Sequence, residues 1–372
     1  MAARTLASGR TIAPHEWLFL FATTGTCYAI PWNDTPPESS VRGSGLEGDL
    51  SLALTLTSIG TINNGELSPD GKFIAFALTG SPFVVVYPWN DLTGFGSKVS
   101  DPASLPNNKA VSVSWSPDGR YLAVAQFSGT EYLAVYPWSN GAFGTKVAAP
   151  ATPPPGVAGA NVKSVAWHPG GRFIALGTTA SPFVNVWDWD GSAFGAKWSD
   201  PGTLPAGSGF GVAWSPDGAY VACGHNTTPF ISVYPVGNSA FGTKVADPAP
   251  LATATMSIVE WTPDGLHLVG ASTAAGSSRQ YCRWAWSGGF GILEQDGANT
   301  LARGRIAMHK AGYFVYGIAT TVPVFRSYEA SANGSPGIQN SLNALRAVGW
   351  SSRNRTLASG RTLAAGRTLA GS

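Results

Sequence analysis

One short turn motif recurs along most of the chain and constrains its fold more than any other feature. The string W-S-P-D-G stands at Trp115–Gly119 and Trp214–Gly218, with variants at Leu67–Gly71, Trp167–Gly171, Trp261–Gly265 and Met308–Gly312. The final glycines are residues 71, 119, 171, 218, 265 and 312, so successive copies are 48, 52, 47, 47 and 47 residues apart. A period this regular indicates one structural unit repeated along the chain.

Each copy continues in the same order after its turn. An alternating run such as RYLAVAQ follows, then a small turn that often reads S-P-F, then a second run such as YLAVYPW. β-branched and aromatic residues at period two, bounded by Gly, Pro and Asp, predict β-strands. Proline presets the backbone angle of the P-D-G turn and glycine accepts a positive one, so this turn suits a tight hairpin.

The two ends of the chain together supply one further copy. Residues Glu16–Asp34 match the two middle strands of a unit, and Ala344–Asn354 match the strand that precedes them. Seven units of about 48 residues fill residues 14–350, and a four-stranded unit of this length is typical of a propeller blade. The sequence therefore predicts an all-β, seven-bladed β-propeller over 14–350, with one blade closed by the N- and C-terminal strands. The arms 1–13 and 351–372 extend from it.

Composition excludes several classes of protein. Only 12% of the 372 residues are charged, while Gly (46) and Pro (27) are abundant, which argues against disorder and against a helical bundle. A formal charge of +2 predicts neither nucleic acid nor membrane as a partner. Three scattered cysteines favour a reducing compartment, and the first residues lack the apolar core of a signal peptide. We expect a soluble protein that is not exported by the usual secretory route.

The hydrophobic strand, S-P-D-G turn and aromatic-ended strand resemble the WD40-like propeller superfamily, although a Trp-Asp pair stands only at Trp187–Asp188. The closely similar copies, with phrases such as SPF and VYPW, are also similar to repeat proteins of tailed-phage virions. This resemblance implies a non-enzymatic structural protein, a capsid decoration or tail-associated module, located in the virion and assembled in the cytoplasm of a bacterial host.

The chain ends carry a second repeat, R-T-L, with a period of six residues. An even period places every arginine on one side of an extended chain and every leucine likewise. We therefore expect extended arms that anchor the propeller to other virion proteins or to another copy of the chain. The predicted contact residues are Arg4, Leu6, Arg10, Arg355, Leu357, Arg361, Leu363, Arg367 and Leu369.

Tryptophans fall into two sets. One set ends the expected inner strands and is predicted to lie between blades. The other ends a later strand near the rim and could form a platform for host surface glycans, although packing between blades is the favoured interpretation. The second set is Trp32, Trp89, Trp138, Trp189 and Trp286.

Familiar catalytic and metal-binding motifs do not occur in the sequence. The five histidines form no H-E-x-x-H pair, there is no Walker loop, and the recurring turn aspartates are expected to bond their own turns. We therefore predict no catalytic residue, no metal and no cofactor. Three alternatives stay open: a carbohydrate- or receptor-binding propeller, a propeller lyase or hydrolase, and a bacterial scaffold. For an enzyme, the irregular segments Arg279–Arg283 and Arg303–His309 are the first places to search.

Overall fold

A computed structural model describes residues 59–90, 93–128, 131–154, 161–272 and 281–297. Outside these ranges it describes only the backbone of short strands between residues 4 and 56 and between 306 and 350. Every regular element in the described part of the chain is a β-strand, and all the strand pairs are antiparallel. The prediction of an all-β fold is confirmed.

Five small sheets form the part in which side chains are described. The first contains β6 (Ile62–Leu67), β7 (Phe73–Leu78), β8 (Val84–Asn90) and β9 (Gly94–Phe95). The second contains β10 (Ala110–Trp115), β11 (Tyr121–Gln126), β12 (Leu133–Ser139) and β13 (Ala142–Phe143). The third contains β14 (Val162–Trp167), β15 (Phe173–Thr178), β16 (Val184–Trp189) and β17 (Phe194–Lys197). The fourth contains β18 (Gly209–Trp214), β19 (Tyr220–His225) and β20 (Ile231–Pro235). The fifth contains β21 (Ile258–Trp261), β22 (His267–Ala271), β23 (Tyr281–Trp286) and β24 (Phe290–Gly297).

The remaining strands are described by their backbone alone. One sheet contains β25 (Ile306–Met308), β26 (Phe314–Ile318), β27 (Val324–Tyr328) and β28 (Asn340–Ser341). Another joins β29 (Leu345–Trp350) to β3 (Glu16–Ala22), β4 (Thr26–Trp32) and β5 (Leu54–Leu56). A two-stranded ribbon pairs β1 (Arg4–Thr5) with β2 (Thr11–Ile12).

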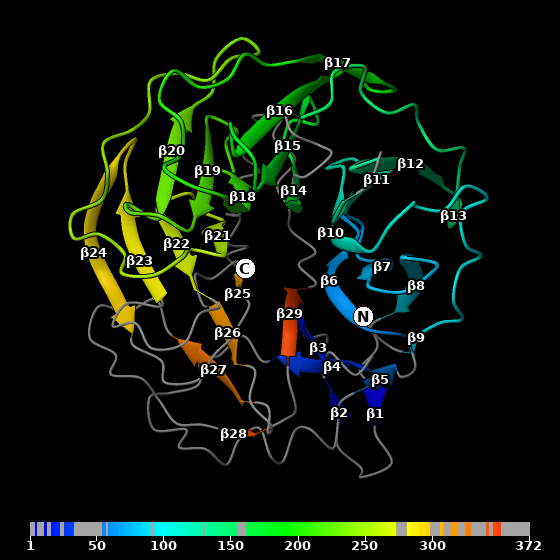
Figure 1. The fold of residues 1–372 in the computed structure, drawn as a ribbon. Coiled ribbons are helices and arrows are strands. Elements are labelled where there is room, and N and C mark those ends of the chain that lie inside the picture. The colour runs from blue at the N-terminus through cyan, green and yellow to red at the C-terminus, as the bar shows by residue number, and fades with distance from the viewer. Residues whose placement is uncertain are drawn as a thin grey trace, which may run out of the picture.

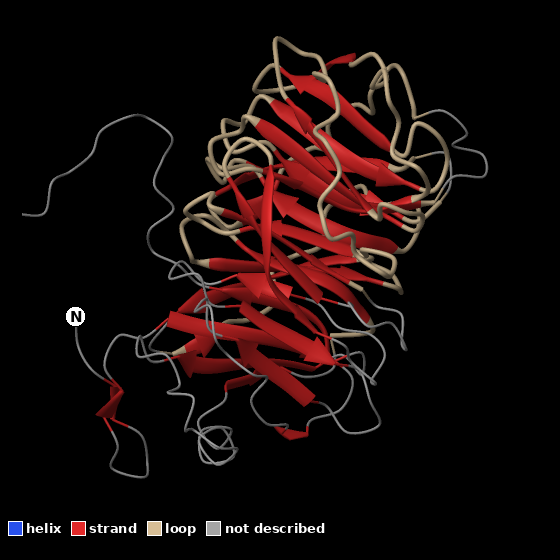
Figure 2. Cartoon of the chain, turned by 90° about the vertical axis from the view of Figure 1, so that its left-hand side faces the viewer, coloured by secondary structure: helices blue, strands red, loops and turns tan. Residues whose placement is uncertain are grey.

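The first strand of each sheet lies on the inside of the assembly. Strand β10 contacts β6 and β14, and β18 contacts β14 and β21. Figure 1 shows the sheets arranged round a common centre, with these first strands innermost, and Figure 2 shows the strands from the side. The inner strands are therefore where residues from different repeats come closest together.

The P-D-G turn explains the hairpin between the first and second strands. In the second sheet, Asp118 Oδ1 accepts hydrogen bonds from the Ser116 hydroxyl at 2.6 Å and from the Arg120 amide at 3.1 Å. Gly119 has a φ of 72°, which only glycine adopts without strain. Asp70, Asp217 and Asp264 bind their own turns in the same way, as the sequence predicts.

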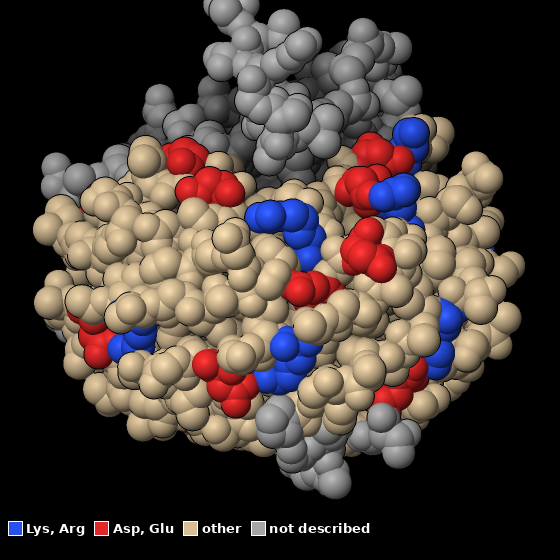
Figure 3. All heavy atoms as spheres, turned by 90° about the horizontal axis from the view of Figure 1, so that it is seen from above, with Lys and Arg blue, Asp and Glu red and all other residues tan. Residues whose placement is uncertain are grey.

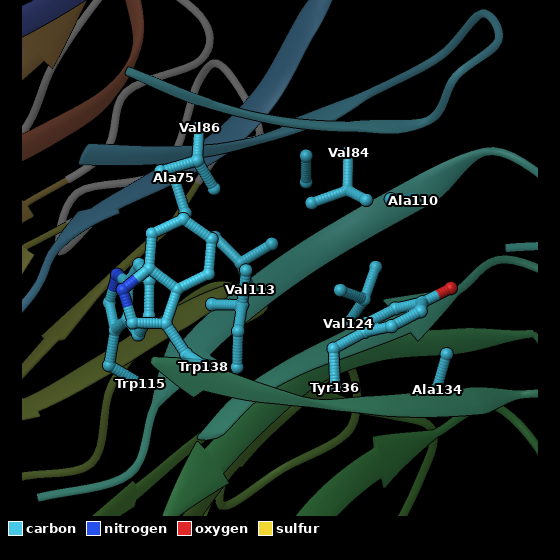
Figure 4. Close-up of a cluster of buried hydrophobic side chains, with 12 residues drawn as sticks. Ala75, Val84, Val86, Ala110, Val113, Trp115, Val124, Ala134, Tyr136 and Trp138 are labelled. Carbon is cyan, nitrogen blue, oxygen red and sulfur yellow. The ribbon is translucent and has the colours of Figure 1, made fainter. Parts of the chain in front are cut away.

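Tryptophans pack where each of the five described sheets meets the next. The Trp115 indole N–H donates to the Glu66 carbonyl of the preceding sheet at 3.1 Å, and its ring meets Trp138 edge to face at 5.2 Å. Figure 4 shows both rings among valines and alanines from the first and second sheets. Burying these large rings against small aliphatic side chains is the main stabilisation that the repeat supplies between sheets.

Four described inner strands contain an extra residue near their N-terminal end. In β10, Ala110 pairs with Gln126 and Ser112 with Ala125, so Val111 lies between two successive pairs. The equivalent residues are Asn63, Lys163 and Phe210. A β-bulge of this kind redirects one side chain out of the regular alternation, and bulges are common beside active sites.

Candidate functional site

Two lysines differ from all the others whose side chains are described. Five of those seven lysines form ion pairs, namely Lys72–Asp70, Lys98–Asp101, Lys146–Glu131, Lys197–Asp200 and Lys244–Asp247. Figure 3 shows such mixed acidic and basic groups on one side of a mostly uncharged surface. Lys109 and Lys163 have no carboxylate within salt-bridge distance among the described residues. Neither lysine is therefore paired with a carboxylate in the part of the chain whose side chains are described.

Both lysines lie against the same aromatic ring. The Lys109 Nζ is 3.6 Å from the centroid of the Phe127 ring, and the Lys163 Nζ is 4.8 Å from it. Lys163 is also 5.6 Å from the Phe210 centroid. All four side chains are half-buried, so they are partly open to solvent. We call these four residues the lysine–phenylalanine cluster; cation–π attraction at these distances stabilises it.

The cluster combines three repeats. Lys109 immediately precedes β10, Phe127 immediately follows β11, and the Phe127 amide donates to the Lys109 carbonyl at 3.0 Å. Lys163 and Phe210 are the bulge residues of β14 and β18, which contact each other. The cluster therefore lies at the N-terminal ends of neighbouring inner strands.

Gln126, which is completely buried, holds the Lys109 segment in place. Its Oε1 accepts hydrogen bonds from the amides of Asn107 at 2.6 Å and Asn108 at 3.0 Å. Its Nε2 donates to Glu131 Oε2 at 3.4 Å, and Glu131 is in turn ion-paired with Lys146 at 2.8 Å. This network fixes the backbone that leads into Lys109 and the start of the loop that carries Phe127.

The pKa of Lys163 is a further difference between this lysine and the others. Burial lowers the pKa of Lys163 below its ordinary value, and the nearby charge of Lys109 lowers this pKa again. A lysine with a lowered pKa holds a larger fraction of neutral amine near physiological pH, and a neutral amine can accept a proton. The cluster thus combines a cation, Lys109, with a candidate base, Lys163.

The predicted glycan platform is buried rather than exposed. Trp89, Trp138, Trp189 and Trp286 are between 3% and 7% exposed and meet neighbouring rings edge to face. This is the packing role that the sequence favours for the set. The side chain of Trp32 is outside the described residues.

The predicted arm contacts are described in one place only. Arg4 lies in β1 and pairs with Ile12 of β2, and the two strands run antiparallel. The other eight predicted contact residues lie outside the described residues: Leu6, Arg10, Arg355, Leu357, Arg361, Leu363, Arg367 and Leu369. Their role in binding partners stays a prediction.

The irregular fifth sheet contains a second polar cluster. Arg283 stands at the repeat position that other sheets fill with a buried valine, such as Val186. Its Nη2 lies 2.9 Å from His267 Nε2 and 3.4 Å from Glu294 Oε2, and His267 Nε2 lies 3.1 Å from the same oxygen. The Arg283 side chain is 5% exposed. The His267 and Glu294 side chains are 15% and 25% exposed, so this cluster reaches the surface in part while Arg283 is buried.

Other buried titratable groups are sealed from solvent. His225 is completely buried and lies 3.0 Å from the Ser232 hydroxyl, and burial lowers its pKa to about 4, so its imidazole is neutral at physiological pH. Cys223 and Cys282 are free thiols in the core. Within the described ranges, no three His, Cys, Asp or Glu side chains gather closely enough to bind a metal ion. No helix in those ranges could span a bilayer.

Comparison with known proteins identifies the fold. No protein-family model and no curated protein sequence matches the chain. A periplasmic gluconolactonase of Pseudomonas aeruginosa is similar in structure, with a TM-score of 0.67 and 15% identity over 91% of this chain and 100% of that one. A putative 6-phosphogluconolactonase of Bacteroides uniformis gives 0.65 and 14%, over 91% and 100%. The corresponding protein of Bacteroides fragilis gives 0.63 and 12%, over 91% and 98%. The chain has a β-propeller-like fold.

These similarities overturn the function expected from the phage-like repeats. The sequence predicts a non-enzymatic virion structural protein, yet the three similar structures are all described as lactonases, two of them as putative ones. That prediction, with its assignment as a non-enzyme, is wrong, because closely similar blades are a property of the fold and carry no information about a virion. The hydrolase alternative agrees better with these structures. The predicted virion location and arm partners are not tested by them.

The sequence motifs do not single out the lysine–phenylalanine cluster. Lys98, Lys146, Lys197 and Lys244 recur at one position of the repeat, whereas Lys109 and Lys163 stand outside that position. A lysine that stands outside the recurring position is the feature of the sequence that could have pointed to this site. The irregular segments of the sequence predict a site elsewhere, whereas the cluster lies between two regular sheets.

Proposed function

We propose that the protein is a propeller hydrolase that opens a sugar lactone at the lysine–phenylalanine cluster. The observation that carries the proposal is the pair of lysines, lacking carboxylate partners among the described residues, on one aromatic ring, with the pKa of Lys163 lowered by burial and by Lys109. The names of the similar lactonases support the choice of a cyclic ester as substrate. Half-buried phenylalanines on either side of Lys163 suit the carbon skeleton of such a ring.

The lysines have separate tasks in this reaction. In its deprotonated form, the Lys163 amine accepts a proton from water as the water oxygen attacks the lactone carbonyl. The ammonium of Lys109 stabilises the negative charge that develops on the carbonyl oxygen. The ring C–O bond then breaks, and the leaving alkoxide takes the proton back from Lys163. The product is the open hydroxy acid, and both lysines return to their starting states.

We also propose that the sheets form a closed seven-bladed ring over residues 14–350, flanked by the two arms. The pairing of β29 with β3 supports this, because it joins the chain ends within one sheet. The contacts of β29 with both β6 and β25 support it further, since β29 then has a neighbour on each side. Such a ring places the N-terminal ends of the inner strands around one centre.

An acid-release assay tests the proposed activity. We expect the full chain to accelerate hydrolysis of glucono-lactone or its 6-phosphate above the spontaneous rate, measured by pH-stat titration. Lys163→Met removes the base and should lower kcat/KM by about 100-fold or more. Lys197→Met, which changes a lysine paired with Asp200 on the outer strand, is the matched control and should retain the activity.

Two results would contradict the proposal. The first is that neither lactone is hydrolysed faster than in buffer. The second is that Lys163→Met hydrolyses lactone as fast as Lys197→Met while both variants show the circular dichroism of the parent protein.

A further inference from the structure

A pocket lies at the other end of the inner strands, where the P-D-G turn of the second sheet meets the equivalent P-G-G turn of the third. Its volume is about 350 Å³, at the small end of the range for ligand sites. Lys109 precedes β10 and Ser116 follows it, so this pocket and the lysine–phenylalanine cluster lie at opposite ends of the strand. We call it the turn pocket.

A departure from the repeat coincides with the turn pocket. The third sheet has W-H-P-G-G where the other described turns have an aspartate, so Gly170 stands at the position of Asp118. His168 takes over the bonding of this turn, because its Nδ1 accepts from the Gly170 amide at 2.9 Å. One wall of the pocket therefore consists of Gly170 and Gly171, which present backbone without side chains.

Aromatic rings line the turn pocket. Tyr121 and Trp167 each meet Trp189 edge to face, with centroids 5.0 and 5.2 Å apart. These rings are the apolar part of the lining. The weakly positive C–H groups of a saturated ring pack well on the negative faces of aromatic rings.

The rim of the turn pocket carries one ion pair. Arg120 Nε donates to Asp118 Oδ2 at 2.6 Å, and their side chains are 66% and 44% exposed. Among the described residues, the other two guanidinium nitrogens have no partner, and the carboxylate can accept further bonds. Donors and an acceptor thus stand side by side, and Arg120 and Asp118 together contribute no net charge to the lining.

We propose that the turn pocket binds a neutral hexopyranose. Adjacent hydroxyls of such a sugar each donate one hydrogen bond and accept others, which matches the paired Arg120 and Asp118. The C–H groups of the sugar would lie against half-buried Tyr121 and the small exposed parts of Trp167 and Trp189, and the glycine wall leaves room for the chair-shaped ring. A charged ligand is disfavoured because it would leave one member of the ion pair opposed by a like charge. This binding goes beyond the proposed hydrolysis and uses different residues.

The test is a titration of the full chain with methyl α-glucopyranoside, methyl β-galactopyranoside and methyl α-mannopyranoside, followed by saturation-transfer NMR and tryptophan fluorescence. We expect at least one glycoside to bind with a Kd in the millimolar range. Arg120→Gln keeps a polar side chain with N–H donors but removes the charge, and should weaken this binding about tenfold by removing charge-assisted bonds. Lys72→Gln is the matched control, because Lys72 pairs with Asp70 in the equivalent turn outside the pocket lining.

The proposal is overturned if none of the three glycosides binds, or if Arg120→Gln binds as tightly as Lys72→Gln. Binding of glucuronate alone also overturns it, because that result requires net positive charge. Methyl glycosides contain no lactone, so their binding is independent of the proposed hydrolysis. Lys163→Met should retain glycoside binding, and Arg120→Gln should retain lactone hydrolysis, which separates failure of one proposal from failure of the other.

Discussion

The outer lysines and the central lysines of this protein occupy contrasting settings. Lys98, Lys197 and Lys244 each reach an aspartate three residues later, and the same phrase recurs in successive repeats. Lys109 and Lys163 come from different repeats, lack a carboxylate partner among the described residues and converge on one phenylalanine ring. The lysines at the recurring position are neutralised by a carboxylate in their own unit, whereas Lys109 and Lys163, which stand outside that position, lie together at the inner strands.

Lys146 is an intermediate case and gives the largest expected effect on stability. It belongs to the recurring set, but its partner is Glu131, and the two side chains are only 18% and 11% exposed. Glu131→Gln leaves Lys146 half-buried without a counter-charge and weakens the contact to Gln126. We expect the free energy of unfolding to fall by about 1–3 kcal/mol, measured by urea denaturation. An unchanged value would show that Lys146 behaves like the exposed lysines.

The variant Lys109→Met tests the setting of the central lysines through the pH dependence of lactone hydrolysis. The charge of Lys109 contributes to the lowered pKa of Lys163, so in Lys109→Met that pKa should rise toward its ordinary value. Less neutral amine is then present at pH 7, and the rising limb of the rate profile should move to higher pH. We expect lactone hydrolysis near neutral pH to fall by about tenfold, since the oxyanion also loses a cation. An unshifted profile would mean that Lys163 is not the base.

Asp200→Asn gives the smallest expected effect. The Asp200 side chain is 48% exposed, and exposed ion pairs contribute little because solvent and salt screen them. We expect a loss below about 1 kcal/mol that diminishes further in 0.5 M salt, again by urea denaturation. A loss as large as that of Glu131→Gln would remove the distinction between exposed and half-buried pairs.

Sequence periodicity predicts the framework well because the repeat is local. The expected inner strands ending at Trp115, Trp167, Trp214 and Trp261 all form, and the turn aspartates bind their own backbone. The favoured packing role of the outer tryptophans also agrees with their burial. These features depend on neighbours within one unit or on an identical unit beside it.

The lysine–phenylalanine cluster and the turn pocket depend on residues that differ between the repeated units. The period of the sequence reports what the units share, so it does not predict these sites. Lys109 and Lys163 meet at Phe127 because β10 and β14 are neighbours and because β14 bulges at Lys163. Neither fact can be predicted from the period of the repeat. Gln126 looks like an ordinary strand end until its bonds to Asn107 and Asn108 are seen. Likewise, Gly170 reads as a degraded turn in the sequence, and only the packing of two turns reveals a pocket beside it.

The inner-strand bulges leave this fold unusually free to vary. Asn63, Val111, Lys163 and Phe210 occupy the same step of four duplicated units, yet they are an amide, an aliphatic group, an amine and an aromatic ring. Each lies outside the paired ladder, but Asn63 also donates to the Ala110 carbonyl of the second sheet at 2.6 Å. A combinatorial library limited to the codons of Val111, Lys163 and Phe210 could therefore recruit new chemistry while the paired strands stay as they are.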